Sequence, residues 1–145
     1  MTNVLDLYNF AEEQGIEVYW LSLECAESLS YCDSKGDCFI AMNPWCLPTI
    51  AEEQTKLAHE LGHCCTGAFY NRYATCDVRQ KHENRADKWA IQHLIPKSKL
   101  DAAVADGHTE IWDLAEYFDV TENLMRKAIC WYMHGNLTTD LYMTA

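Results

Sequence analysis

The sequence of 145 residues contains no apolar run that approaches the ~20 residues of a membrane-spanning helix. Its first residues, MTNVLDLYNFAEEQG, include acidic side chains and lack the basic segment and apolar stretch of a secretory signal peptide. No internal repeat and no linker rich in glycine, serine or proline divides the chain. We therefore expect one cytoplasmic domain without a membrane partner.

The eight cysteines include no C-x-x-C pair, which argues against a structural zinc ribbon. Cys64 and Cys65 are adjacent, and on a helix they would point about 100° apart, so they cannot bridge one another. Because nothing predicts secretion, we expect reduced cysteines that pack as small hydrophobic side chains.

Basic residues are scarce, since 11 Lys and Arg against 22 Asp and Glu give a formal net charge of −11. Nucleic-acid binding rests on neutralising phosphates, so direct binding of nucleic acid is not expected. Residues 111–132 have the apolar spacing of a helix-turn-helix, but their acidic side chains outweigh Arg126 and Lys127. We interpret this segment as a structural or substrate-docking helical hairpin, and a DNA-binding regulator is the weakest alternative.

Hydrophobic periodicity predicts a helix at 3–14 and a strand at 16–23. A hairpin follows, in which SLSYC and DCFIAMN flank the turn DSKG. Residues 99–136 are typical of two or three short helices, broken near Gly107 and near residues 119–121. The order predicts an α+β fold, with a small antiparallel or mixed sheet packed on one long helix and a mostly helical C-terminal half.

Two capping boxes predict the starts of the two longest helices. Thr49–Glu52 would begin a helix that ends near Thr66, and Asp77–Gln80 would begin a second one. Pro96 stops this second helix after Ile95.

The first of these helices contains the segment KLAHELGHCC. His59 and His63 are four residues apart, so both side chains leave the same face and can share one cation. Glu60 is rotated by about 100° and can flank the metal without binding it. Ligand, general base and ligand are the roles that H-E-x-x-H has in metallopeptidases. The alternative is a pair of histidines at helical spacing with ordinary hydrogen bonds.

A third ligand is predicted on the next helix, where Glu83 and Asp87 share one stripe with Ala86, Ala90 and Leu94. Small alanines favour close packing on the first helix, which would bring Glu83 to the metal. Asp87, one turn further, could accept a hydrogen bond from the far ring nitrogen of a ligand histidine. A solvated acidic pair is the alternative for these two carboxylates.

Other arrangements of the metal site are less consistent with the sequence. His82 is a second candidate for the third ligand, but it points away from the alanine stripe. The metzincin motif is excluded, because it requires glycine and histidine where the chain has Thr66 and Phe69. Tyr70 and Tyr73, between the two helices, are candidates to polarise a scissile carbonyl, or are plain packing residues.

HELGH followed by ENRADKWAIQHLIP resembles the ImmA/IrrE-like metallopeptidases, which are bacterial and phage-encoded enzymes of the gluzincin type. The similarity is tight over residues 38–97 and looser to residue 134. It implies one Zn²⁺ per chain, held by His59, His63 and Glu83, with Glu60 as the general base. It also implies a protein substrate, namely a helix-turn-helix repressor of a prophage, a mobile element or a stress regulon.

We thus expect a single metallopeptidase domain over 1–145. Residues 1–48 would form a helix and the small sheet, 49–97 the metal-binding helix pair, and 98–145 a helical closing region. The leading hypothesis is a zinc-dependent intracellular endopeptidase that cleaves a DNA-binding repressor. The alternative is a non-hydrolytic, antirepressor-like module that binds a repressor and uses the metal only for structure.

Overall fold

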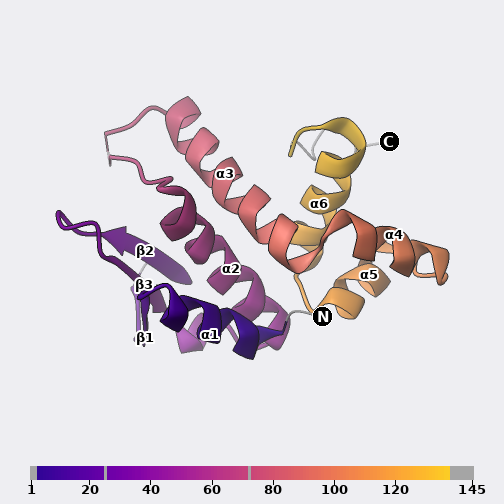
Figure 1. Cartoon of the computed structure of the whole chain (residues 1–145), viewed down its shortest axis with the longest axis horizontal. Coiled ribbons are helices and arrows are strands. Elements are labelled where there is room, and N and C mark those ends of the chain that lie inside the picture. The colour runs from indigo at the N-terminus through magenta and orange to yellow at the C-terminus, as the bar shows by residue number, and fades with distance from the viewer. Residues whose placement is uncertain (1–2, 25, 72, 138–145) are drawn as a thin grey trace.

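The structure is a computed structural model that describes residues 3–24, 26–71 and 73–137. α2 and α3 run side by side through the middle of the molecule, with α1 and the sheet at one end and α4 to α6 at the other (Figure 1). The helices are α1 (Val4–Glu13), the 3-10 helix η1 (Pro44–Cys46), α2 (Ile50–Thr66), α3 (Cys76–Leu94), α4 (Lys97–Ala105), α5 (Ile111–Phe118) and α6 (Glu122–His134), and the strands are β1 (Glu17–Trp20), β2 (Ser28–Cys32) and β3 (Cys38–Met42).

The sheet is mixed and has the order β1-β3-β2. β1 is parallel to β3, and β2 is antiparallel to β3 with Cys32 opposite Cys38. Asp33 accepts backbone hydrogen bonds across the turn that joins β2 and β3, as its position in DSKG predicts. The predicted α+β fold and hairpin are therefore confirmed, and β2 lies at an edge of the sheet.

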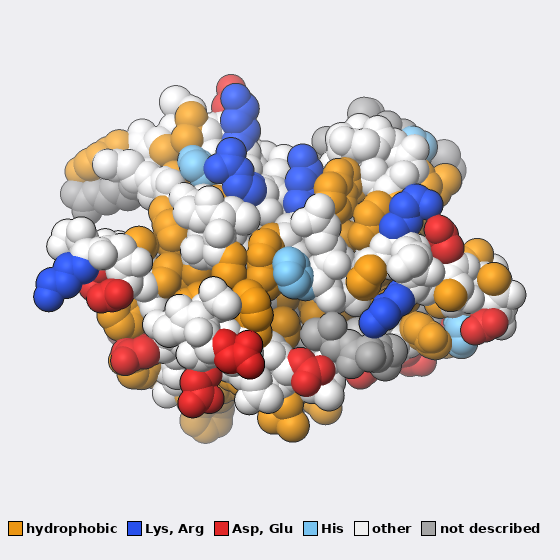
Figure 2. Space-filling view, viewed as in Figure 1, with side chains coloured by type: hydrophobic (Ala, Val, Ile, Leu, Met, Phe, Trp, Pro, Cys, Tyr) orange, Lys and Arg blue, Asp and Glu red, His pale blue; other side chains and the backbone are white. Residues whose placement is uncertain are grey.

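The core lies where α2 packs on β3 and α3. Ile40 and Met42 of β3 are completely buried, as are Leu57 and Leu61 of α2. No helix among the described residues is long and apolar enough to span a membrane. On the face shown in Figure 2, acidic side chains gather over α1 and the sheet, whereas most lysines and arginines lie over α3 and the C-terminal helices.

Helix caps agree with the sequence in part. Thr49 accepts a hydrogen bond from the backbone N–H of Glu52, as predicted, at 3.1 Å. The second predicted box is wrong, because α3 begins at Cys76 and Thr75 caps it through the N–H of Val78. The hydroxyl of Thr75 serves as the N-cap acceptor two residues before Asp77, and Asp77 lies in the first turn of α3 instead.

α2 and α3 approach one another closely at Gly62. A Cβ atom at this position would lie 2.5 Å from the backbone oxygen of Ala86. Ala86 and Ala90 are completely buried, as the alanine stripe predicts. The absence of side-chain bulk at the crossing brings the backbones of the two helices into contact.

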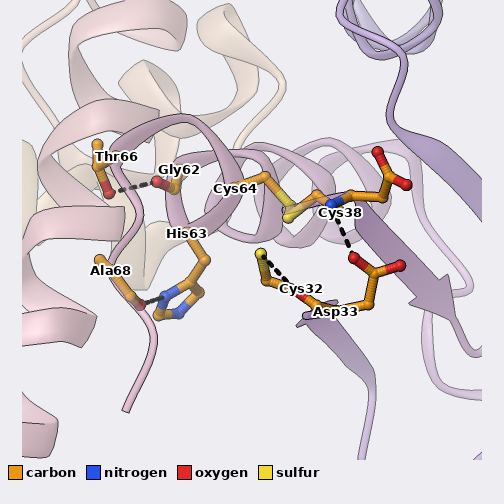
Figure 3. Close-up of a disulfide and its surroundings, with 9 residues drawn as sticks. Cys32, Asp33, Cys38, Gly62, His63, Cys64, Thr66 and Ala68 are labelled. Atoms are coloured by element: carbon orange, nitrogen blue, oxygen red, sulfur yellow. Dashed lines mark hydrogen bonds between the residues drawn. A yellow bond between two sulfur atoms is a disulfide. The ribbon is translucent and has the colours of Figure 1, made fainter. Parts of the chain in front are cut away.

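One expectation about the cysteines is wrong. Cys38 of β3 and Cys64 of α2 form a disulfide, with Cα atoms 5.9 Å apart (Figure 3). The sequence does not predict this pair, because the two cysteines are far apart in the chain and only the packing of the hairpin on α2 brings them together. The described free cysteines are also mostly exposed, and only Cys130 is buried as predicted.

Candidate metal centre

The two histidines of HELGH lie on one face of α2, near its C-terminal end. Their Nε2 atoms are 3.2 Å apart, and their rings meet edge to face. His63 is buried, and the side chain of His59 is 19% exposed. The spacing of four residues thus brings two nitrogen atoms to one point at the protein surface.

Glu83 of α3 faces the same point. Its Oε2 atom lies 2.7 Å from Nε2 of His59 and 3.3 Å from Nε2 of His63. The close approach of Gly62 and Ala86 positions this carboxylate, because it sets the distance between the two helices. Within the described part of the chain, His59, His63 and Glu83 form the one group that could hold a metal ion.

The far ring nitrogens fix the tautomers of both histidines. Nδ1 of His63 donates to the backbone oxygen of Ala68, at 2.5 Å, and a carbonyl can only accept. Nδ1 of His59 lies 2.7 Å from Oδ1 of Asp87, which is ionised and likewise accepts. In each neutral ring, Nε2 therefore carries a lone pair and no proton.

These atoms fit a metal ion. Two lone pairs and a carboxylate oxygen repel one another at such distances unless a proton or a cation lies among them. Ligand atoms of a tetrahedral zinc ion, at ~2.1 Å from the metal, are ~3.4 Å apart. Two of the three separations, 3.2 and 3.3 Å, agree with that value. Nitrogen and carboxylate donors also suit Zn²⁺ chemically.

Without a metal, the two histidines and the carboxylates change one another's pKa values. Burial disfavours the charged form of His59, but hydrogen bonds with Asp87 and Glu83 outweigh it and raise the pKa of His59 to about 9. Burial also opposes charge on His63, yet the bonds with Glu83 and the Ala68 carbonyl raise its pKa. Burial would raise the pKa of Glu83, but both histidines hold it far below its usual range.

Asp87 is buried and joins the centre to α6. Its Oδ1 contacts His59, and its Oδ2 accepts a hydrogen bond of 2.9 Å from Nζ of Lys127. Burial opposes ionisation, but these two cationic partners lower the pKa of Asp87. The predicted contact between Asp87 and a ligand histidine is thus present in the structure.

Glu60 is buried beside the two histidines, at 6% exposure. Its Oε2 accepts a hydrogen bond of 2.7 Å from the hydroxyl of Ser28, at the start of β2. One carboxylate oxygen is thereby fixed from the sheet. Sequence reasoning did not find Ser28, because its contact spans 32 positions and no local pattern marks it.

The centre opens into a cleft of about 520 Å³. Residues 27–30 of β2 and its approach line one side, and residues 68–70, which follow α2, line the other. Glu60 and the three metal-capable side chains line the space between them. This volume is within the range of cavities that take small molecules or peptide side chains.

Of the other predicted residues, one contacts the candidate metal centre and two do not. The hydroxyl of Tyr70 donates to Oε1 of Glu83 at 2.9 Å, so it orients the predicted ligand. Tyr73 is 78% exposed and does not line the cleft. The ring of His82 lies 6.0 Å from that of Tyr70, and His82 is outside the metal-capable group.

Comparison with known proteins agrees with this geometry. A search of curated proteins found no significant match. The model of the family Peptidase_M78, described as the IrrE N-terminal-like domain, matches residues 11–129, which include both helices of the centre and all three strands. The chain therefore belongs to the peptidase family of the IrrE N-terminal-like domain.

Proposed function

We propose that this protein is a zinc-dependent endopeptidase. The convergence of two Nε2 lone pairs and the Glu83 carboxylate on one point, with Glu60 beside it in an open cleft, carries this proposal. Membership of a peptidase family supports hydrolysis of peptide bonds as the reaction.

His59, His63 and Glu83 would hold one metal ion per chain. A bound Zn²⁺ lowers the pKa of water to about 7 and polarises a carbonyl oxygen. Asp87 and the Ala68 carbonyl keep the proton of each ligand histidine on Nδ1, which leaves Nε2 free to bind the metal.

Glu60 acts as the general base in this proposal. Its carboxylate accepts a proton from the attacking water and passes it to the amine that leaves. The hydrogen bond from Ser28 occupies one oxygen of Glu60 and limits its rotation, so the other oxygen is presented to the cleft. Tyr70 holds Glu83 in place through its hydroxyl.

The edge strand β2 suits an extended substrate. Ser28, Leu29 and Ser30 line the cleft, and β2 pairs with β3 on one side only. A peptide laid along the free edge could form backbone hydrogen bonds while its scissile bond faces the metal. An internal segment of a protein can bind in this way, which favours an endopeptidase.

We further propose a cytoplasmic helix-turn-helix repressor of a prophage, a mobile element or a stress regulon as the substrate. The resemblance of HELGH and ENRADKWAIQHLIP to the ImmA/IrrE-like metallopeptidases implies this choice, and the net charge of −11 would attract basic DNA-binding proteins. Direct DNA binding by α6 is not part of the proposal, because Lys127 pairs with Asp87 and Arg126 lies 3.8 Å from Glu122.

Incubation of the zinc-loaded protein with repressors encoded beside its gene tests this function. We expect defined fragments in mass spectrometry, and none after a chelator is added. Glu60→Gln should keep stoichiometric zinc but lower the cleavage rate by about 10²–10⁴-fold, because the base is lost. Glu83→Ala should lose zinc affinity.

Glu110→Gln, an exposed change far along the chain, serves as the control with the same charge difference. Cleavage that survives in Glu60→Gln would contradict the mechanism. A wild-type protein that binds no stoichiometric metal would contradict the whole proposal. Tight repressor binding without fragments would favour the antirepressor-like alternative.

A further inference from the structure

A second chamber adjoins the metal centre on the side of α6. It has a volume of about 490 Å³ and lies between α2, α3 and the first turn of α6. Glu27, Lys56, His59 and Glu83 line both this chamber and the cleft that contains Glu60. The two spaces therefore adjoin, with the predicted metal ligands His59 and Glu83 at their common boundary.

Most charges in this chamber are already paired. Lys56 lies 3.0 Å from Glu27, and Lys127 lies 2.9 Å from Asp87. Glu83 contacts both histidines. Both lysines of the chamber are thus occupied, and neither supplies an additional positive charge.

Glu52 is the exception. Its Oε2 atom is buried and has no hydrogen-bond partner among the described residues. A carboxylate at this third position of α2 normally reaches back to the backbone of the capping residue, but only the Thr49 half of the predicted box is formed. The side chain lines the second chamber instead. The Glu52 carboxylate thus belongs to the chamber wall and has no hydrogen bond or ion pair with a described residue, so a cation that entered the chamber could pair with it.

Position along α2 relates Glu52 to the centre. Glu52, Thr55, Lys56 and His59 recur at the spacing of one helical face, and all four line the chamber. His59 is seven positions after Glu52, which is about 10 Å along the helix axis. An extended peptide advances ~3.3 Å per residue, so a long side chain one or two residues from the cut bond would reach Glu52.

We propose that the second chamber is a substrate subsite for a cationic side chain, arginine or lysine, with Glu52 as its counter-charge. This inference rests on the proposed function, and it narrows the substrate to peptides with a basic residue close to the scissile bond. DNA-binding proteins are rich in such residues, because they neutralise phosphates with lysine and arginine.

A binding experiment tests the subsite without hydrolysis. The probes are Nα-acetyl-arginine amide and its uncharged analogue Nα-acetyl-norleucine amide, titrated into the zinc-loaded protein. Backbone amide signals of Gln80 and Asn123, which line the chamber, report the binding by NMR. We expect the arginine probe to bind at least about 10-fold more tightly than the norleucine probe, as a charge-assisted hydrogen bond allows.

Two variants sharpen the test. Glu52→Gln should abolish the preference for the arginine probe. Glu53→Gln removes the same charge from the same turn, but Glu53 accepts a hydrogen bond from Tyr8 and does not line the chamber, so the preference should remain. Equal affinity for both probes in the wild type, or a preference that survives in Glu52→Gln, would overturn the subsite.

A second experiment, with peptide substrates, distinguishes failure of the subsite from failure of the proposed function. Peptides that differ only by arginine or glutamine beside the cut bond should differ at least about 10-fold in kcat/KM with the wild type and with Glu53→Gln, but not with Glu52→Gln. If the arginine probe binds as expected and no peptide is cut, the subsite stands and the endopeptidase function is wrong. If both peptides are cut at the same rate, the endopeptidase function is supported and the subsite is wrong.

Discussion

At the scale of single residues, the proposed chemistry depends on side chains that do not contact the proposed metal ligands. Ser28 is the clearest case, because its hydroxyl is the described partner of the buried Glu60 carboxylate. A general base must be held within hydrogen-bond reach of the proton that it takes. The orientation of Glu60 is therefore set from the sheet, not from the helix that carries it.

Replacement of Ser28 tests this dependence. We expect Ser28→Ala to lower kcat by about 10- to 100-fold, since a hydrogen bond to a charged group contributes about 1.5–3 kcal/mol, while zinc affinity stays unchanged. Ser30→Ala is the matched control, because Ser30 lies two residues further on β2 and also lines the cleft. Activity of Ser28→Ala equal to that of Ser30→Ala would show that Glu60 is positioned in another way.

At the scale of elements, the metal centre is a product of how α2 and α3 cross. Two of the proposed ligands come from α2 and one from α3, and the crossing is tight because Gly62 faces the backbone of Ala86. The glycine of HELGH is thus required by the packing of the two helices. The disulfide between Cys38 and Cys64 attaches β3 to the same end of α2, next to His63.

Gly62→Ala should disturb both stability and metal binding. Its Cβ would lie 2.5 Å from the Ala86 oxygen, so the helices must separate, at a cost of about 1–3 kcal/mol. We expect a melting temperature lower by several degrees and weaker zinc binding, measured by calorimetry with and without metal. Cys65→Ala, at an exposed site of α2, should change neither. An unchanged zinc affinity in Gly62→Ala would show that the positions of the proposed ligands do not depend on this crossing.

At the scale of the whole molecule, the centre links stability to pH. The pKa of His59 is raised from 6.5 to about 9 in the folded, metal-free protein, so its stabilisation is complete below pH 6.5 and is lost as the pH rises to about 9. The pKa of Glu83 is lowered, so its contribution is present above about pH 4.5 and is lost as the pH falls.

The melting temperature of the metal-free protein should therefore fall between pH 6.5 and 9, when measured by thermal denaturation in a chelator. Zinc must displace the proton that His59 carries in this interval, so the stabilisation that zinc adds should increase over the same interval. The zinc-saturated protein is the control, and its curve should be flatter. A metal-free melting temperature that rises from pH 6.5 to 9 would contradict the protonated state of the centre.

Local patterns determined much of this protein. Periodicity of 3.6 and 2 residues, turn residues and proline predicted the helices and the hairpin, since these signals act over a few positions. His59, Glu60 and His63 were recognisable because one helical turn fixes their relation. The alanine stripe with Glu83 and Asp87 extended this reasoning to a second helix, and the structure brings those carboxylates to the histidines.

Only the tertiary structure decided contacts between distant segments. The partnership of Ser28 with Glu60 and the disulfide between Cys38 and Cys64 depend on how the hairpin packs on α2. The salt bridge of Lys127 with Asp87 joins residues 40 positions apart. The residues near a side chain in the sequence do not predict such partners, because the packing of the whole fold brings them together. For the same reason Glu52, predicted to cap its own helix, faces a chamber instead.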